Sequence, residues 1–82
     1  MHVIEDEKTD ALYIYLDDGR PAATRQIEQG TIVDLDADGR LIGIGVICRH
    51  RAWPVEEILG SYAVSEADET RLRRLAGLTG PG

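Results

Sequence analysis

Hydrophobic and polar residues alternate along the first half of the chain with the period of two that is typical of β-strands. The clearest case is residues 11–16, Ala-Leu-Tyr-Ile-Tyr-Leu, in which Leu12 and Ile14 share one side while Tyr13 and Tyr15 share the other. Such a segment has an aliphatic face and an aromatic face. The pattern therefore predicts a strand with two useful faces.

Four further runs predict strands, with turns between them: residues 2–5, 22–28, 31–35 and 41–47. The alternation is weak in 22–28, which predicts an edge strand. Polar residues at 6–10 predict a turn or hairpin loop between the first two strands. The run Asp-Asp-Gly-Arg-Pro at 17–21 predicts a second turn, before the strand that begins at residue 22.

A hairpin is predicted around Asp38-Gly39, because this dipeptide suits a tight turn between two β-rich runs. A two-residue turn pairs Leu35 with Ile42. A bulged turn with Gly39 in the left-handed region instead pairs Leu35 with Leu41. The sequence leaves both registers open.

Strand alternation ends near residue 48, and the chain then has helical signals. Pro54 begins a short predicted helix over 54–59, with Gly60 as its stop. A second helix is expected after Ser65, a residue type that caps helix N-termini.

The second predicted helix carries an apolar stripe that includes Leu72 and Leu75 and closes at Gly77. We expect this stripe to dock on the sheet or on a second subunit. A glycine- and proline-rich tail follows at 78–82.

These elements predict a single domain with an α+β fold: a small, mostly antiparallel, twisted β-meander of four to five strands, packed with one or two C-terminal helices. The meander occupies residues 1–48 and the helical segment residues 53–77. With 82 residues, the chain has room for one modest core.

Charge and composition argue against several classes of function. The chain has 15 acidic and 9 basic residues and a formal charge of −6, which disfavours binding to nucleic acid. Its apolar runs fall short of the roughly 20 residues that cross a bilayer, so no membrane role is expected. A single cysteine and the lack of a signal pattern favour a reducing cytoplasm.

Residues 34–39, Asp-Leu-Asp-Ala-Asp-Gly, resemble the opening of a calcium loop, because Asp34, Asp36 and Asp38 alternate before Gly39. The twelfth position of such a loop, where a bidentate glutamate belongs, is Gly45. The three aspartates are therefore read first as strand and turn carboxylates, and they are weak candidates for a cation site.

Cys48 and His50 are weak candidates for a ligand site. They alternate on an extended segment, and flanking arginines favour the thiolate. Since no third group is found to orient the histidine, and one cysteine with two histidines is a poor zinc set, a structural role is favoured.

Two segments resemble a known family: residues 10–16, DALYIYL, and residues 30–47, GTIVDLDADGRLIGIGVI. They look like the small prokaryotic proteins called domain of unknown function 2283, over about residues 1–50. The resemblance implies a compact β-rich domain and carries no activity, cofactor or catalytic residue. The chain departs from the family in Gly45, where an acidic residue is frequent, and in its longer helical extension.

A noncatalytic protein-interaction module that acts as a homodimer is the expected function, because no set of nucleophile, base and orienting group is found. The expected interaction surface comprises Tyr13, Tyr15, Leu72 and Leu75. No enzyme activity and no cofactor are expected.

Two alternate glycines of the same strand, Gly43 and Gly45, leave a bare surface that a second copy is expected to cover. A basic protein partner, in an antitoxin-like role, is consistent with the negative charge. The alternative is a small ligand- or divalent-cation-binding protein, or an enzyme, with its site at a dimer interface.

Overall fold

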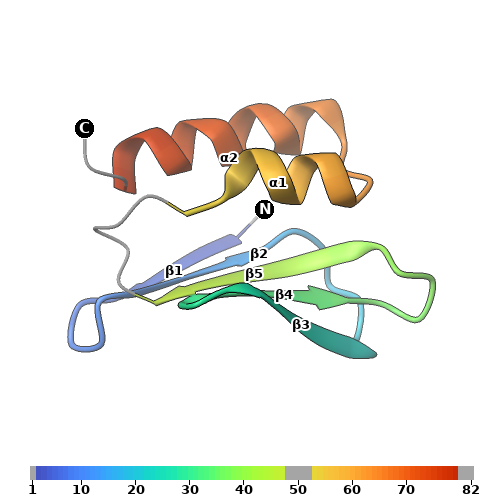
Figure 1. Cartoon of the computed structure of the whole chain (residues 1–82), viewed down its shortest axis with the longest axis horizontal. Helices are drawn as coiled ribbons and strands as arrows, with labels where there is room; N and C mark the ends of the chain where they lie inside the picture. Colours follow the sequence, from blue (N-terminus) through green and yellow to red (C-terminus); the bar gives the residue numbers. More distant parts are fainter. Residues whose placement is uncertain (1, 48–52, 80–82) are drawn as a thin grey trace.

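The computed structural model describes residues 2–47 and 53–79, which form a sheet with two helices on one face (Figure 1). The strands are β1 (His2–Asp6), β2 (Ala11–Tyr15), β3 (Ala23–Glu28), β4 (Thr31–Leu35) and β5 (Leu41–Ile47). The helices are α1 (Val55–Ser61) and α2 (Glu66–Thr79). This confirms the predicted α+β fold.

The five strands lie in the order β1-β2-β5-β4-β3, and every neighbouring pair is antiparallel. β5 is therefore central, with β2 on one side and β4 on the other. Only β3, β4 and β5 form a continuous meander, because β2 pairs with β5 and the chain crosses to the far edge before β3. β3 is an edge strand, as its weak alternation predicts.

The β4–β5 hairpin contains a bulge, which decides between the two registers that the sequence allows. Leu35 pairs with Leu41, whereas Val33 still pairs with Ile44, so Ile42 is the additional residue. Gly39 has a φ of 81°, in the left-handed region that favours glycine. The bulged alternative is thus correct at the turn.

The hydrophobic core lies between the helices and the sheet. β2 contributes Leu12 and Ile14, and the helices contribute Ile58 and Leu72, all at most 1% exposed. The other members of the core are Val33, Leu35, Leu41, Ile44, Val46 and Trp53. The apolar stripe of α2 therefore docks on its own sheet, so Leu72 is not on an exposed surface, and Leu75 is half-buried against the same core.

Both helices extend slightly past their predicted ends. α1 continues through Gly60, and α2 continues through Gly77. The predicted start of α2 is confirmed, because the Ser65 hydroxyl oxygen accepts a hydrogen bond from the Asp68 N–H at 3.2 Å. Asp68 belongs to the acidic first turn, which complements the helix dipole.

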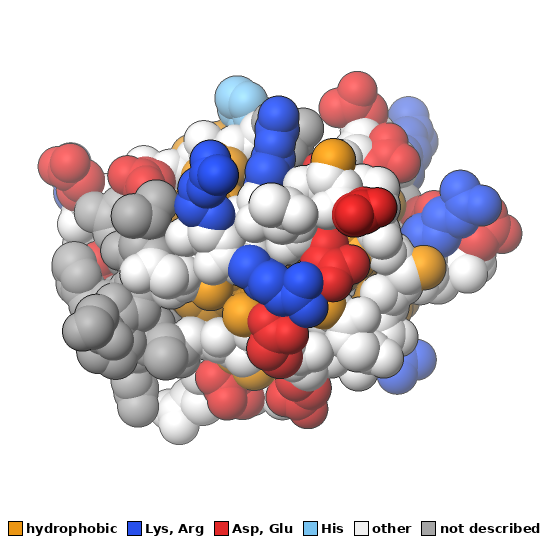
Figure 2. Space-filling model, turned by 90° about the horizontal axis from the view of Figure 1, so that it is seen from above, with side chains coloured by type: hydrophobic (Ala, Val, Ile, Leu, Met, Phe, Trp, Pro, Cys, Tyr) orange, Lys and Arg blue, Asp and Glu red, His pale blue; other side chains and the backbone are white. Residues whose placement is uncertain are grey.

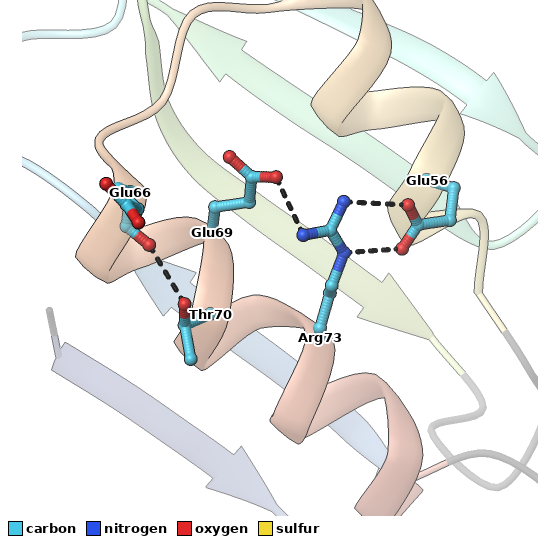
Figure 3. Close-up of polar contacts among 5 residues, drawn as sticks. All are labelled: Glu56, Glu66, Glu69, Thr70 and Arg73. Carbon is cyan, nitrogen blue, oxygen red and sulfur yellow. Dashed lines mark hydrogen bonds and ion pairs between the residues drawn. The ribbon is translucent and has the colours of Figure 1, made fainter.

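A charged cluster links the two helices (Figure 3). The guanidinium of Arg73 on α2 donates two hydrogen bonds to the Glu56 carboxylate on α1, at 2.9 and 3.0 Å, and contacts Glu69 at 2.7 Å. Arg73 lowers the pKa of Glu56 and in turn has its own pKa raised. Figure 2 shows acidic and basic side chains next to one another over this helical side of the molecule.

Candidate functional site

The sheet has a second face, opposite the helices, on which no described element packs (Figure 1). Because alternate residues of a strand share a face, the residues between the core positions point to this side. We call it the open face. Its residues are His2, Ile4, Asp6, Ala11, Tyr13, Tyr15, Thr24, Gln26, Ile32, Asp34, Gly43, Gly45 and Ile47.

All the large hydrophobic side chains that are exposed in the described part of the chain lie on the open face. They are Ile4 at 46%, Tyr15 at 42%, Ile32 at 36% and Ile47 at 60% exposure. They come from four different strands, so they are spread across the sheet. Singly exposed apolar residues are ordinary, but a set gathered on one face is typical of an interaction surface.

Of these four residues, only Tyr15 belongs to the interaction surface predicted from the sequence. The three isoleucines were detectable, because the alternation in β1, β4 and β5 places Ile4, Ile32 and Ile47 opposite the core positions. What the sequence does not show is that the helices cover one face of the sheet and leave the other open.

Tyr13 occupies the space that the glycines of β5 leave free. A Cβ added to Gly43 would lie 2.8 Å from the Tyr13 hydroxyl oxygen, and one added to Gly45 would lie 3.3 Å from the Tyr13 ring. The ring therefore lies flat over both glycines. The expectation of a bare glycine surface is wrong, because Tyr13 of the same chain fills it.

Asp34 holds the Tyr13 ring in place. Its carboxylate accepts hydrogen bonds from the hydroxyl of Tyr13 and, at 2.7 Å, from the hydroxyl of Thr24. These contacts join β2, β4 and β3 across the open face. Burial raises the pKa of the Asp34 carboxyl group.

Aromatic rings continue from Tyr13 toward the sheet edge. The ring centroids of Tyr13 and Tyr15 are 4.4 Å apart, and those of His2 and Tyr15 are 6.2 Å apart. Such tilted pairs are favourable contacts that fix the ring positions. Tyr15 is consequently a positioned, exposed aromatic side chain.

A shallow apolar hollow of about 330 Å³ lies on the open face beside these rings. Ala11, Gly30, Ile32 and Ile47 contribute to its lining, together with Gln26 at its polar side. Small residues and isoleucines thus make up much of its lining. A hollow of this kind accepts an apolar or aromatic side chain.

The aspartates of the calcium-like stretch do not converge. Asp34 faces Tyr13 and Thr24, whereas Asp36 accepts hydrogen bonds at 2.9 Å from the backbone N–H groups of Asp38 and Arg40, as a turn-forming aspartate does. Within residues 2–47 and 53–79, no group of three or more His, Cys, Asp or Glu side chains is placed to hold a metal.

The other weak candidates for a ligand site, Cys48 and His50, lie outside the described residues. Neither described helix is long and apolar enough to cross a membrane.

The fold and its open face define a class of small α+β domain, with a five-stranded antiparallel sheet covered on one side by C-terminal helices. Comparison with known families is consistent with the resemblance seen in the sequence. The family described as "Protein of unknown function (DUF2283)" matches residues 6–47, about half of the chain, and the chain belongs to this family. No curated protein and no solved structure matches the chain.

The matched segment contains β2 to β5, and it ends before the helices begin. The family match therefore includes most of the open face, namely the positions from Asp6 to Ile47, but neither of the helices that cover the opposite face. The two helices are the extension that the sequence predicted.

Proposed function

We propose that this chain is a noncatalytic protein-interaction module that acts as a homodimer through the open face of its sheet. The observation that carries the proposal is the gathering of Ile4, Tyr15, Ile32 and Ile47 on that face. Burial of these side chains against a partner removes apolar surface from water, which is the main driving force of association.

The chemistry of the face supports binding over catalysis. Its central carboxylate, Asp34, already accepts two hydrogen bonds from neighbouring hydroxyl groups, of Tyr13 and Thr24. A second copy would meet these groups with their hydrogen bonds formed. Burial then costs little in unpaired polar atoms.

The size of the face sets the expected strength of the dimer. Five strands about 4.8 Å apart, each about 17 Å long, span a projected area of about 400 Å². A second copy brings a face of the same extent, whereas stable complexes bury about 800 Å² per partner. A weak dimer, with a dissociation constant in the micromolar range, is therefore expected.

Sedimentation equilibrium over a range of concentrations tests this proposal. Ile32→Lys places a charge in the middle of the open face and is expected to make the chain monomeric. Thr70→Lys is the matched control, because Thr70 is exposed on α2, on the opposite side of the molecule, and gains the same charge. Circular dichroism establishes that both variants are folded.

Two outcomes contradict the proposal. A wild-type chain that stays monomeric at the highest soluble concentration has no homodimer of this kind. Equal effects of Ile32→Lys and Thr70→Lys place the contact away from the open face.

A second candidate, binding of a basic protein in an antitoxin-like role, is favoured by one observation. The strand positions of the open face hold Asp6 and Asp34 but neither lysine nor arginine. A basic partner complements such a surface. Native mass spectrometry of the protein isolated gently from its host separates the two candidates, because the complex then weighs either two copies or one copy plus another polypeptide.

A further inference from the structure

Strand pairing arranges the open face in three rows that run across the strands. The middle row is Ile4, Tyr13, Gly45, Ile32 and Gln26. One end row is His2, Tyr15, Gly43, Asp34 and Thr24. The other end row is Asp6, Ala11 and Ile47.

The two end rows differ in size and charge along the same strands. On β1, His2 stands at one end and Asp6 at the other. On β2 the large Tyr15 is matched by the small Ala11 at the far end. The surface therefore complements itself when it is reversed along the strand direction.

We propose, on the basis of the homodimer proposed above, that two copies pack face to face about a two-fold axis that runs along the middle row. Tyr15 of each copy then enters the hollow beside Ala11 of the other copy. His2 of each copy then lies over Asp6 of the other. Such a dimer has two identical sets of contacts, as a two-fold interface requires.

The middle row meets itself in this arrangement, so Ile4 and Ile32 of one copy lie over the same residues of the other. Ile47 lies over the Gly43 position, which the hydroxyl end of the Tyr13 ring covers. Face-to-face sheets pack about 10 Å apart with their strands within about 30° of one another. The reversal keeps the strands aligned in this way.

The other two-fold arrangement, with its axis along the strands, fits less well. It places Ile4 over Gln26, which buries an amide against an aliphatic side chain. It also places Tyr15 over Asp34, whose carboxylate already accepts hydrogen bonds from Tyr13 and Thr24. The end-to-end reversal instead places Ile4 and Ile32 over the same residues of the other copy, and it places the His2 imidazole, a hydrogen-bond donor, over the Asp6 carboxylate.

Mixing two variants tests the orientation. His2→Asp places two carboxylates opposite each other at both ends of its homodimer, and Asp6→Lys places a lysine opposite His2 at both ends. In the mixed dimer, Asp at position 2 faces Lys at position 6, and Asp6 faces His2. The mixed dimer is therefore expected to exceed the statistical half of all dimers.

Native mass spectrometry of an equimolar mixture, with one chain labelled with ¹⁵N, reads this fraction directly. At physiological ionic strength each of the two mismatched homodimers is expected to dissociate about fivefold more readily than wild type, since each has lost two His2–Asp6 contacts of the exposed kind. His2→Asp mixed with Thr70→Lys is the control in which the added lysine lies away from the open face, and it is expected to give the statistical fraction.

Asp6 also accepts a hydrogen bond from the Lys8 N–H at 3.0 Å, so Asp6→Lys removes a contact in the β1–β2 turn. Tyr15→Ala provides a test that leaves this turn intact. It empties the hollow of the other copy and is expected to weaken the dimer at least tenfold.

The possible outcomes are distinct. A statistical mixture, together with a Tyr15→Ala chain that dimerises like wild type, overturns this orientation while the homodimer stands. A wild-type chain that is monomeric, or that is found with a basic polypeptide in place of a second copy, overturns the homodimer itself.

Discussion

Tyr13 shapes the centre of the open face. Its ring lies over two glycines of β5, and its hydroxyl group donates to Asp34 on β4. The glycines are needed because any Cβ at these positions meets the ring or, at Gly45, also the Ile32 side chain at 3.0 Å. The flat surface of the open face thus depends on the absence of two side chains.

Gly43→Ala is expected to destabilise the chain by about 1–3 kcal/mol, because the new Cβ displaces a ring that is anchored at its far end. In a Tyr13→Leu background the same change is expected to cost much less, since the two residues are in contact. Urea denaturation measures both values.

Gly60→Ala is the control for this substitution. A Cβ at Gly60 meets nothing within 4 Å, and the residue is in α1, so alanine there is expected to stabilise the chain by about 0.5–1 kcal/mol. Equal costs of Gly43→Ala with and without Tyr13 would show that the ring is not the cause.

At the scale of elements, the two helices are attached to the sheet by side-chain burial. Leu72 and Ile58 are fully buried in the core that they share with strand residues, whereas Arg73 and Glu56, which join the helices, are both exposed. Exposed ion pairs contribute little to stability. The docking of α2 therefore depends on its apolar stripe.

Leu72→Ala is expected to destabilise the chain by about 2–5 kcal/mol, through the loss of buried methyl groups and the cavity that remains. Arg73→Gln removes the exposed ion pairs and is expected to have a far smaller effect. Thermal denaturation of the two variants compares them. A larger loss from Arg73→Gln would mean that the charged cluster holds the helices.

Most of the elements were predictable from the sequence because their signals are local. The alternation in residues 11–16 gives β2 with its two faces, and Ser65 gives the start of α2. Strand order is not local: nothing in the alternation of 22–28 shows that β3 pairs with β4 at the far edge while β2 pairs with β5. Two turn types fit the residues around Gly39, so the strand register there is decided only by the backbone conformation of the turn.

The candidate site was predictable in part for the same reason. Tyr15 was selected because its face is visible in the alternation. Tyr13 was placed on the correct face, but its contact with Gly43 and Gly45 depends on strand pairing. Leu75 was assigned to an interaction surface, although the stripe is used within the chain, because a helical stripe does not specify what it packs against.

At the scale of the whole molecule, net charge opposes self-association. Each copy has a formal charge of −6, so two copies repel each other at long range. Salt screens this repulsion, with a Debye length that falls from about 30 Å at 0.01 M to about 8 Å at 0.15 M. The dimer is therefore expected to be severalfold tighter at physiological ionic strength than at low salt.

Sedimentation equilibrium at the two salt concentrations measures this difference. The helical-surface variant Thr70→Lys, which reduces the net negative charge from −6 to −5, is expected to show a smaller dependence on salt. A dimer that weakens as salt is added would mean that attractive ionic contacts outweigh the repulsion between the two copies.

The central position of β5 has a consequence for how the chain reaches its fold. β5 joins the β1–β2 hairpin to the β3–β4 hairpin, and the two hairpins have no strand pairing with each other. Isolated two-stranded hairpins are marginal in water. The first 40 residues therefore have no stable partial structure to form during synthesis, and the sheet is expected to assemble in one cooperative step once residues 41–47 are available.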